Sequence, residues 1–398
     1  MKRIVYITQQ YPPEASANAS RIDDMVRNLI KRGHEVVVVC PHPTFPFGLF
    51  RRAILPKKIK KSDKLSVVRL PTWQPSESDP PMFSRLLYYL LFPFFSTIWC
   101  IFNNKKFDVM ICSSPPIFTA LPVLLNCKMF QKLAIVEVRD LWIDASIGLG
   151  FMSRGGMAEK IGRAFEKKTL DAANMITVVT NSIRKRLTEL YSVSEEKVKT
   201  VPNGTIIPNC VKKDSDSRTI FFAGNLGHAY DLQHAIMAMK YVIDDRAVLV
   251  IAGDGDLKHQ LESVVRREHL EKKVKFIGVI PRELVFSMLS DAALGIIPYK
   301  NLDGLDYCQP VKAYECMACK TAYVGCGGEE FKELTRLSGA GEIVEGNPKS
   351  ISDAINRLLR NKELRMRMGI NGHEFVKKNF NRETIAYEFS NEIESILV

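Results

Sequence analysis

The sequence predicts an α/β protein of two domains, each a parallel β-sheet with helices between its strands. The first observation is length, because 398 residues exceed what one hydrophobic core usually fills. The second is that short apolar runs rich in β-branched residues alternate with segments of helical periodicity. The third is that this alternation stops at a polar segment, residues 206–217, and begins again at Thr219.

Composition and charge restrict the partners. The chain is 46% hydrophobic and 25% charged, as in an ordinary soluble protein. Its 56 Lys and Arg against 44 Asp and Glu give a net charge of +12, which favours nucleotides, nucleic acid or an acidic membrane surface as partners. Nine scattered cysteines are unlike a disulfide framework and indicate a reducing compartment. The first apolar run is too short for a signal peptide, so we expect a cytoplasmic protein.

The first domain, residues 1–205, opens with a strand, a helix and a second strand. Residues 4–8 and 35–40 have the pattern of buried strands, and residues 20–32 have helical periodicity that ends at Gly33. The loop after the first strand is rich in small residues but lacks the glycines of a dinucleotide fingerprint, so it does not argue for NAD. Further strands are expected at residues 107–112, 134–138, 175–179 and 198–201, with helices at 118–125, 157–170 and 181–190.

Arg139 and Asp140 follow the expected strand at residues 134–138. Charged groups are costly to bury without partners, and the carboxyl ends of strands are where open α/β sheets bind ligands. We therefore expect both side chains to face a cleft. The alternative is a structural ion pair between the two neighbours.

Two segments of the first domain indicate contact with a membrane. An apolar run begins at Leu86 and ends at Phe102, and Pro93 and its length make it a poor spanning helix. A basic stretch near an aromatic-rich helix is typical of a protein that lies on an anionic membrane surface. The alternative is a core helix with a solvated basic loop nearby. Between residues 51 and 64 the basic residues, against the single acid Asp63, are Arg51, Arg52, Lys57, Lys58, Lys60, Lys61 and Lys64.

The second domain, residues 218–381, begins after the linker at residues 206–217. The expected strand at residues 219–223 is followed by the turn from Gly224 to Gly227 and a helix from about Asp231, which would offer backbone amides and a positive helix end to a diphosphate. Gly253-Asp254-Gly255 is a tight turn in pattern, not a metal site. Other strands are expected at 247–251, 274–277 and 294–297, and helices at 283–289, 361–380 and 382–397.

The most informative stretch lies between the strand at 294–297 and the next strand near Val324. A polar loop leads to Pro310, which suits a first helical turn, and Lys312 and Glu315 then fall three residues apart on one helix face. A cation that can meet a phosphate thus lies beside a carboxylate that can accept two sugar hydroxyls, at the carboxyl edge of a sheet. This is the chemistry of holding a nucleotide sugar. The alternative is an ordinary solvated Lys/Glu pair.

No metal or cofactor is expected. Cys316 and Cys319 lie on the predicted helix without a second Cys-x-x-Cys, so buried small residues are favoured over a zinc site. The seven histidines show no ligand spacing.

The chain resembles the glycosyltransferases of family GT4, whose fold, GT-B, has two Rossmann-like domains facing across a cleft. The resemblance extends over nearly all 398 residues. Residues 43–48 and the Arg139 segment further resemble the WbuB-like subgroup, which builds cell-surface glycans. The segments that carry the family resemblance are residues 33–36, 138–142, 177–180, 201–204, 222–227, 252–255 and 310–315.

The resemblance implies a role for each part. The second domain would hold the donor: Glu315 matches the family's second motif glutamate, which binds the ribose. The first motif glutamate falls at Tyr307, so sugar contacts would come from Asp303 or Asp306. The first domain, to which the last helix (382–398) would return, would hold the acceptor. The implied donor-binding residues are Gly224, Asn225, Leu226, Gly227, Gly253, Asp254, Val279, Ile280, Asp306, Lys312 and Glu315; the acceptor-binding residues Glu14, Ala15, Ser16 and Asn18; the catalytic residues Lys312, Arg139 and Asp140.

The expected activity is retaining, metal-independent transfer of a hexose from a nucleotide sugar, UDP-linked in this expectation, to a polyprenyl-linked or other glycan acceptor, without nucleic acid. The enzyme would be attached peripherally to the inner face of the cell membrane. Two alternatives stay open. A nucleotide-sugar 2-epimerase of the same fold would need no acceptor, and a non-catalytic nucleotide-sugar-binding subunit would bind donor without turning it over.

Overall fold

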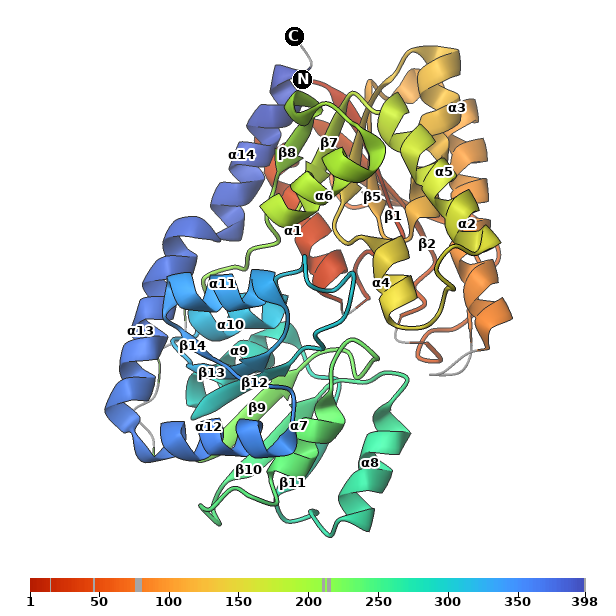
Figure 1. Cartoon of the computed structure of the whole chain (residues 1–398). Helices are drawn as coiled ribbons and strands as arrows, with labels where there is room; N and C mark the ends of the chain where they lie inside the picture. Colours follow the sequence, from red (N-terminus) through yellow and green to blue (C-terminus); the bar gives the residue numbers. More distant parts are fainter. Residues whose placement is uncertain (15, 46, 76–80, 210–211, 213–215, 397–398) are drawn as a thin grey trace. The chain divides into compact units, whose positions relative to one another are not determined.

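The structure is a computed structural model, which describes residues 1–398 except 15, 46, 76–80, 210–211, 213–215 and 397–398, and gives no side-chain description for 82 and 126–128. The chain divides into two units (Figure 1). Unit 1 comprises Met1–Pro202 and Glu383–Val398, and unit 2 comprises Asn203–Arg382. The chain therefore crosses between the units at Pro202, and the expected linker at residues 206–217 lies inside unit 2.

Unit 1 is built on an eight-stranded sheet. Seven strands run parallel, and β3 is the exception because it pairs antiparallel with β4 at the edge. The strand order is β3-β4-β2-β1-β5-β6-β7-β8. The strands are β1 (Arg3–Thr8), β2 (Glu35–Pro41), β3 (Lys57–Lys60), β4 (Leu65–Leu70), β5 (Val109–Ser114), β6 (Leu133–Val138), β7 (Met175–Val178) and β8 (Val198–Thr200).

Helices cover both faces of this sheet. On one face α1 and α14 pack together over the core formed by residues such as Ile22, Met25 and Phe389. On the other, α2 contacts α3 and α3 contacts α5, so the three stand side by side (Figure 1). The helices are α1 (Ala17–Lys31), α2 (Met82–Phe102), α3 (Leu121–Phe130), α4 (Trp142–Gly148), α5 (Met157–Ala172), α6 (Asn181–Tyr191) and α14 (Arg382–Ser395), with the short turns η1 (Asn104–Lys106), η2 (Ile117–Ala120) and η3 (Glu195–Lys197).

The apolar run expected near the membrane forms one helix, α2, which continues through Pro93. The hydroxyls of Ser96 and Thr97 both donate to the Pro93 carbonyl, at 2.9 and 2.7 Å. Within the described residues, Phe83–Phe102 is the one helical segment long and apolar enough to cross a membrane, and 33% of it is buried. A core helix of a soluble protein can meet the same criterion. Its exposed large apolar side chains are Phe83, Leu86, Leu90, Phe94, Ile98 and Phe102.

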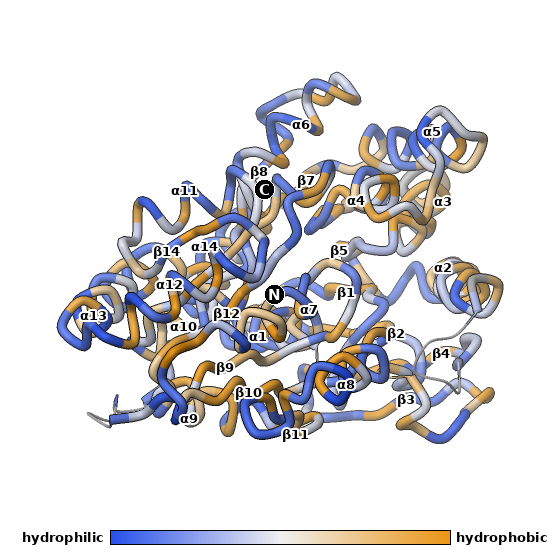
Figure 2. Tube along the Cα trace, turned by 60° about the horizontal axis from the view of Figure 1, so that its bottom comes forward, coloured by the Kyte–Doolittle hydropathy of each residue, from blue (hydrophilic) through white to orange (hydrophobic). Residues whose placement is uncertain are grey.

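Unit 2 is built on a six-stranded sheet in which every strand is parallel, in the order β11-β10-β9-β12-β13-β14. Figure 2 shows hydrophobic residues along β9, β10 and β12, as expected of strands buried on both faces. The elements are β9 (Thr219–Ala223), β10 (Val248–Ala252), β11 (Val274–Gly278), β12 (Leu294–Pro298), β13 (Tyr323–Cys326), β14 (Gly341–Ile343), α7 (Leu232–Ala238), α8 (Lys258–Arg267), α9 (Arg282–Asp291), α10 (Val311–Ala318), α11 (Glu329–Ser338), α12 (Pro348–Arg360) and α13 (Lys362–Asn379).

The two sheets confirm the predicted α/β class. In unit 2 the strand order reverses between β9 and β12, because the chain adds β10 and β11 on one side of β9 and the later strands on the other. Open sheets of this kind bind ligands outside the carboxyl ends of their strands at such a switch point. The ends of β9 and β12 are therefore the first place to look for a site.

Arg382 ties together the two places where the chain leaves unit 2. Its guanidinium is buried and donates to the carbonyls of Asn203, at 3.1 Å, and Gly204, at 2.7 Å. Its backbone amide donates to the Thr205 carbonyl at 2.9 Å. The outgoing and returning segments are thus joined at one buried cation.

Candidate active site

Lys312 lies over the turn that follows β9. Pro310 caps α10 instead of standing in its first turn, and the Lys312 side chain runs back towards Gly224. A Cβ added at Gly224 would lie 2.5 Å from both Cε and Nζ of Lys312. Two aromatic rings also face the ammonium, since Nζ is 4.0 Å from the Tyr230 ring centroid and 5.1 Å from that of Phe222. The predicted meeting of Lys312 with the glycine turn is therefore present in unit 2.

Lys312 and Glu315 do not neutralise one another. In the part of the chain that the structure describes, Lys312 has no carboxylate within 4.0 Å, and the Glu315 carboxylate accepts no hydrogen bond. Burial raises the pKa of Glu315, while the positive charges of Arg282, Lys312 and Arg382 act in the opposite direction. The alternative of a solvated Lys/Glu pair does not describe this geometry. A cation and a carboxylate are both left available at the same sheet edge.

The turn from Gly224 to Gly227 offers fewer amides than the sequence indicated. Gly224 donates its amide to the Ala252 carbonyl and Leu226 to the Asp254 carbonyl, each at 2.9 Å. The Leu226 side chain is fully buried in the core, so this residue holds the turn in place. Among the described residues, the amides of Asn225 and Gly227 have no acceptor. Asn225 is exposed, so its amide remains available to an anion, whereas Gly227 is buried.

Gly253 and Asp254 also serve the loops themselves. The Gly253 amide donates to the Gly278 carbonyl at 2.8 Å, which joins the ends of β10 and β11. Asp254 Oδ1 accepts the Gly255 amide at 2.9 Å and lies 3.7 Å from Lys258 Nζ. Gly253 and Asp254, which were predicted to contact the donor, thus stabilise the turn beside Gly224.

The expected positive helix end is occupied by a side chain of the chain itself. Helix α7 begins at Leu232, and the Asp231 carboxylate accepts the His234 amide at 3.3 Å and lies 2.9 Å from the His234 ring. A carboxylate at a helix N-terminus offsets the helix dipole there. The prediction that the N-terminus of α7 binds the diphosphate is therefore wrong, because the Asp231 carboxylate already occupies it.

Val279 and Ile280 follow β11 and differ in exposure. The Val279 side chain is 46% exposed, whereas Ile280 is half-buried and packs on the core. Val279 can therefore offer an apolar surface to a flat ring.

The loop after β12 contains a polar cluster that sequence reasoning only partly anticipated. Asp306 Oδ1 is buried without a hydrogen-bond partner, and burial together with Asp303 raises the pKa of Asp306. Gln309 donates to Glu330 Oε1 at 2.8 Å and accepts a hydrogen bond from Tyr314. Gln309 and Glu330 were missed, although the two glutamates that open α11 directly after β13 were a usable signal. The cluster gives the site a second set of acceptors.

A cavity of about 570 Å³ opens beside this loop, at the ends of β12 and β13. Asp231, Lys300 and Lys332 are among its charged lining residues. Lys312 and Glu315 do not line it. It is therefore a neighbouring hollow and not the Lys312 site itself.

The residues expected to hold an acceptor in unit 1 are mostly engaged by its own backbone. Glu14 is 3% exposed and accepts amides from Tyr11, at 3.0 Å, and from Thr44 and Phe45, both at 2.9 Å. Burial raises the pKa of Glu14 to about 7. The structure thus gives Glu14 a role in holding two loops, in place of the expected direct contact.

The neighbours of Glu14 differ among themselves. Ser16 caps α1 by accepting the Ala19 amide at 3.0 Å. Asn18 Oδ1 is buried without a partner, so it is free to accept a hydrogen bond. Ala15 lies outside the described residues.

Arg139 retains free donors at the sheet edge of unit 1. It is 9% exposed, and its Nε donates to Ser113 Oγ at 3.1 Å. Burial and the nearby Arg21 lower the pKa of the Arg139 guanidinium, whereas Arg21 itself pairs with buried Glu137 at 2.7 Å. The negative charge of the half-buried Asp140 acts against this lowering, so the alternative of a structural pair between the two neighbours stays open. The two terminal nitrogens of Arg139 remain for a ligand.

No metal-ligand set is found among the residues that the structure describes. Cys316 and Cys319 are buried, as the sequence indicated, and the Cys319 thiol donates to the Phe286 carbonyl at 3.6 Å.

Two parallel sheets, with an open cation and carboxylate beside a glycine turn at the edge of the second, define the GT-B class of glycosyltransferases. The chain belongs to the family 4, or group 1, glycosyltransferases: the description Glycosyltransferase Family 4 matches residues 19–207, and Glycosyl transferases group 1 matches residues 205–375.

Relatives and solved structures agree with this assignment. A protein of Escherichia coli strain K12, whose name describes a colanic acid biosynthesis glycosyl transferase, WcaI, is 23% identical over 99% of this chain and 100% of its own. The structure of sucrose-phosphate synthase from Thermosynechococcus elongatus superimposes with a TM-score of 0.82 at 16% identity, covering 100% of this chain and 99% of the synthase. Anabaena HepE in complex with UDP and glucose gives 0.72 at 13% identity, covering 99% and 100%. These likenesses show the fold.

Proposed function

We propose that the protein is a retaining, metal-independent hexosyltransferase that moves a sugar from a UDP-linked donor to a polyprenyl-linked glycan during synthesis of a surface polysaccharide. The observation that carries the proposal is the position of Lys312 against Gly224, with Glu315 left unpaired on the same helix. The name of the Escherichia coli relative, which refers to colanic acid, supports the glycan class, and the UDP and glucose bound by Anabaena HepE support the donor class.

At the donor end, the two charges of α10 would grip opposite parts of the nucleotide. Glu315 would accept hydrogen bonds from the two ribose hydroxyls, and Val279 would contact the base. Lys312, with the free amide of the exposed Asn225, would meet the diphosphate. Negative charge develops on the diphosphate as the sugar leaves, so donors fixed there before reaction stabilise the transition state more than the bound substrate.

The sugar would lie towards the loop after β12. Asp306 Oδ1 is buried without a hydrogen-bond partner, so it can accept a hydrogen bond from a sugar hydroxyl. Asp306 and the Gln309–Glu330 pair are the candidates that replace the motif glutamate absent at Tyr307.

At the acceptor end, Arg139 and Asp140 would act on the incoming glycan. The terminal nitrogens of Arg139 form a planar donor pair that fits a phosphate or carboxylate. Asp140, half-buried at the end of β6, would orient or deprotonate the attacking hydroxyl. Asn18 would add an acceptor for a sugar hydroxyl.

Attachment to the inner face of the cell membrane would bring the enzyme to a lipid-linked acceptor. The exposed apolar side chains of α2 and the exposed lysines of residues 51–64 lie in the same unit. Together they have the composition of an interfacial contact, in which apolar groups enter the bilayer and lysines meet anionic lipids.

Calorimetry tests the donor site. Glu315→Ala should weaken UDP binding at least about a hundredfold, because two hydrogen bonds to a charged group are lost. Glu333→Ala is the matched control, since Glu333 lies on the surface of unit 2 and pairs only with Arg336, at 2.7 Å, among the described residues. Equal affinity in the two variants would refute the Glu315 assignment.

Product analysis tests the reaction. Mass spectrometry of lipid-linked glycans from cells with and without the gene should show an intermediate that lacks one sugar. Incubation with donor alone should leave the donor sugar unchanged, whereas an epimerised sugar would favour the 2-epimerase. Donor binding without transfer to any lipid-linked acceptor would favour a binding subunit.

A further inference from the structure

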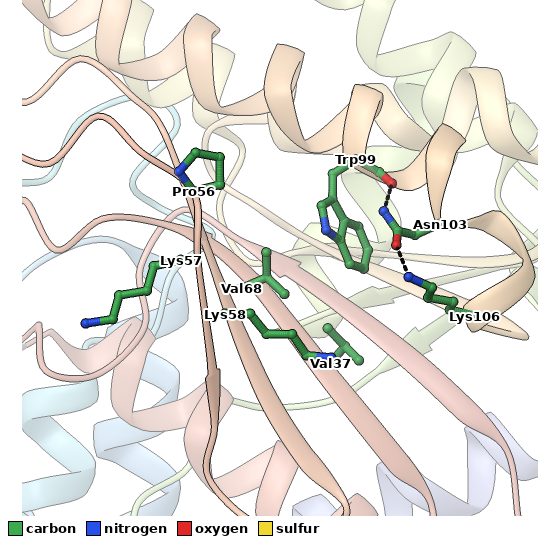
Figure 3. Close-up of a pocket in the computed structure, with 8 residues that line it drawn as sticks. All are labelled: Val37, Pro56, Lys57, Lys58, Val68, Trp99, Asn103 and Lys106. Carbon is green, nitrogen blue, oxygen red and sulfur yellow. Dashed lines mark hydrogen bonds between the residues drawn. The ribbon is translucent and has the colours of Figure 1, made fainter.

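A second pocket lies in unit 1, on the side of the sheet edge where β3, β4 and the end of α2 meet. Its volume is about 280 Å³. Figure 3 shows the Trp99 ring over Val68, with the side chains of Lys58 and Lys106 on either side. The full lining is Val37, Pro56, Lys57, Lys58, Val68, Trp99, Asn103 and Lys106. The pocket thus combines an apolar floor with a basic rim.

The positive charge of this rim is not balanced by the protein. No carboxylate lines the pocket, and among the described residues Lys57 and Lys58 have neither an ion pair nor a hydrogen bond from their side chains. In the described part of the chain, Lys106 Nζ donates only to Asn103 Oδ1, at 2.8 Å. Figure 3 shows the Lys57 side chain pointing away from the other two lysines. The ammonium groups of Lys58 and Lys106 repel one another, so an anion bound between them is favoured.

The nearest acids in the sequence are already engaged. Asp63 pairs with Lys60 at 2.7 Å, and Asp108 pairs with Arg3 at 2.7 Å. Asn103 Nδ2 donates to the Trp99 carbonyl at 2.8 Å, which fixes the amide whose oxygen holds Lys106. The rim is therefore held in place as well as charged.

Exposed apolar side chains flank the pocket on two sides. Ile54 and Leu55, immediately before Pro56, are 77% and 75% exposed. On α2, Ile98 and Phe102 are exposed on either side of Trp99 in the sequence, and they end the apolar ridge that begins at Phe83. Apolar groups beside a tryptophan and lysines match the layers of a membrane interface, where aliphatic side chains enter the acyl region while indoles and ammonium groups stay at the head groups.

We propose that this pocket binds the phosphate head group of an anionic membrane lipid between Lys58 and Lys106, with Trp99 against the glycerol region and Ile54, Leu55 and Phe102 in the acyl layer. The proposal rests on the membrane attachment included in the proposed function. It adds a defined lipid-binding site to the general electrostatic attraction between the basic residues and an anionic membrane. A lipid is favoured over free phosphate because free phosphate makes no use of the flanking apolar residues.

Vesicle flotation with matched double variants tests this site. The full chain is mixed with vesicles of phosphatidylcholine alone or of phosphatidylcholine with phosphatidylglycerol. Lys58→Ser with Lys106→Ser should lower binding to the anionic vesicles at least about tenfold more than Lys61→Ser with Lys64→Ser. Both variants remove two charges, but Lys61 and Lys64 are exposed residues that do not line the pocket. Diffuse attraction would weaken by the same factor for each lysine removed near the surface, so equal losses in the two double variants would overturn the proposal.

Trp99 provides a second readout that does not depend on charge removal. Trp99→Leu should weaken binding to the anionic vesicles several-fold, whereas Trp142→Leu, in the same unit, should not. If glycerol 3-phosphate alone competes fully with the vesicles, the site binds free phosphate and the lipid assignment fails. UDP binding of the unaltered protein, measured separately by calorimetry, reports on the proposed function, so either result can fail without the other.

Discussion

The carboxyl edges of the two sheets use their charged side chains in opposite ways. In unit 2, Lys312 and Glu315 stand on one helix without pairing, beside a glycine turn. In unit 1, Glu14 and Ser16 are engaged by backbone amides of their own loops, and Arg139 keeps only its terminal nitrogens free. The difference indicates that the edge of unit 2 offers a cation and a carboxylate to a ligand. At the edge of unit 1, most polar side chains instead stabilise the loops, and few groups are left to bind a ligand.

The largest effect is expected at Gly224. Its φ of +147° is strained for any other residue, and a methyl group would displace the Lys312 ammonium. Gly224→Ala should therefore lower kcat/KM for sugar transfer about a thousandfold, near the upper limit for losing a charge-stabilising donor. Gly33→Ala is the control, because Gly33 also has a positive φ, +94°, but has open space where the Cβ would lie. Similar activity in both variants would contradict the importance of the Lys312 position.

Lys312→Met should lower kcat about a hundredfold while the fold stays intact, because the ammonium acts on charge that develops only in the transition state. Steady-state kinetics with saturating donor measures this effect. Lys320→Met, at an exposed position two residues after the end of the same helix, should leave kcat within about twofold. A fall in donor affinity without a fall in kcat would assign Lys312 to ground-state binding instead.

Arg139→Gln should raise the acceptor KM about tenfold and leave UDP affinity unchanged, since one charged donor pair is replaced by a neutral one. Kinetics at varied acceptor concentration, with calorimetry for UDP, separates the two ends of the reaction. An unchanged acceptor KM would place Arg139 among the supporting residues of the sheet edge.

Glu14→Gln should have the smallest effect on activity, but it should change how stability depends on pH. The Glu14 pKa of about 7 in the folded chain exceeds the ordinary value of 4.5, so the folded state binds more protons between these values. Stability from this group is fully present below pH 4.5 and is lost as pH rises through 7, by about 3 kcal/mol for the full shift. Urea unfolding should show the stability difference between the natural chain and Glu14→Gln falling between pH 4.5 and pH 8. A constant difference would mean that Glu14 is ionised throughout.

Much of this architecture could be predicted because buried parallel strands have a strong local pattern. The strand at residues 219–223 was placed with the bounds it has as β9. Strand β3 was missed because lysines dominate residues 57–60, and charged residues are how an edge strand avoids further pairing. Strand β4 was missed although the last four of its residues, 65–70, are buried. The other strands were predicted from the alternation of apolar runs and helices, and an antiparallel edge strand such as β3 does not produce this pattern.

The site was predicted where helix spacing and the sheet edge determine it, as for Lys312 and Glu315. It was not predicted where side chains serve neighbouring backbone. The sequence does not show that Leu226 is buried or that Asp231 caps α7, because both depend on what the fold brings near them. Gln309 and Glu330 lie 21 positions apart, and their contact follows from strand order alone.

Arg382 has a consequence for how the molecule could change shape. Because its guanidinium holds the carbonyls of Asn203 and Gly204, both crossing segments belong mechanically to unit 2 up to that residue. Any swing of one unit against the other must then be absorbed by a few backbone torsions next to Pro202 and Glu383. Two short pivots of this kind constrain the direction of movement far more than a twelve-residue tether would.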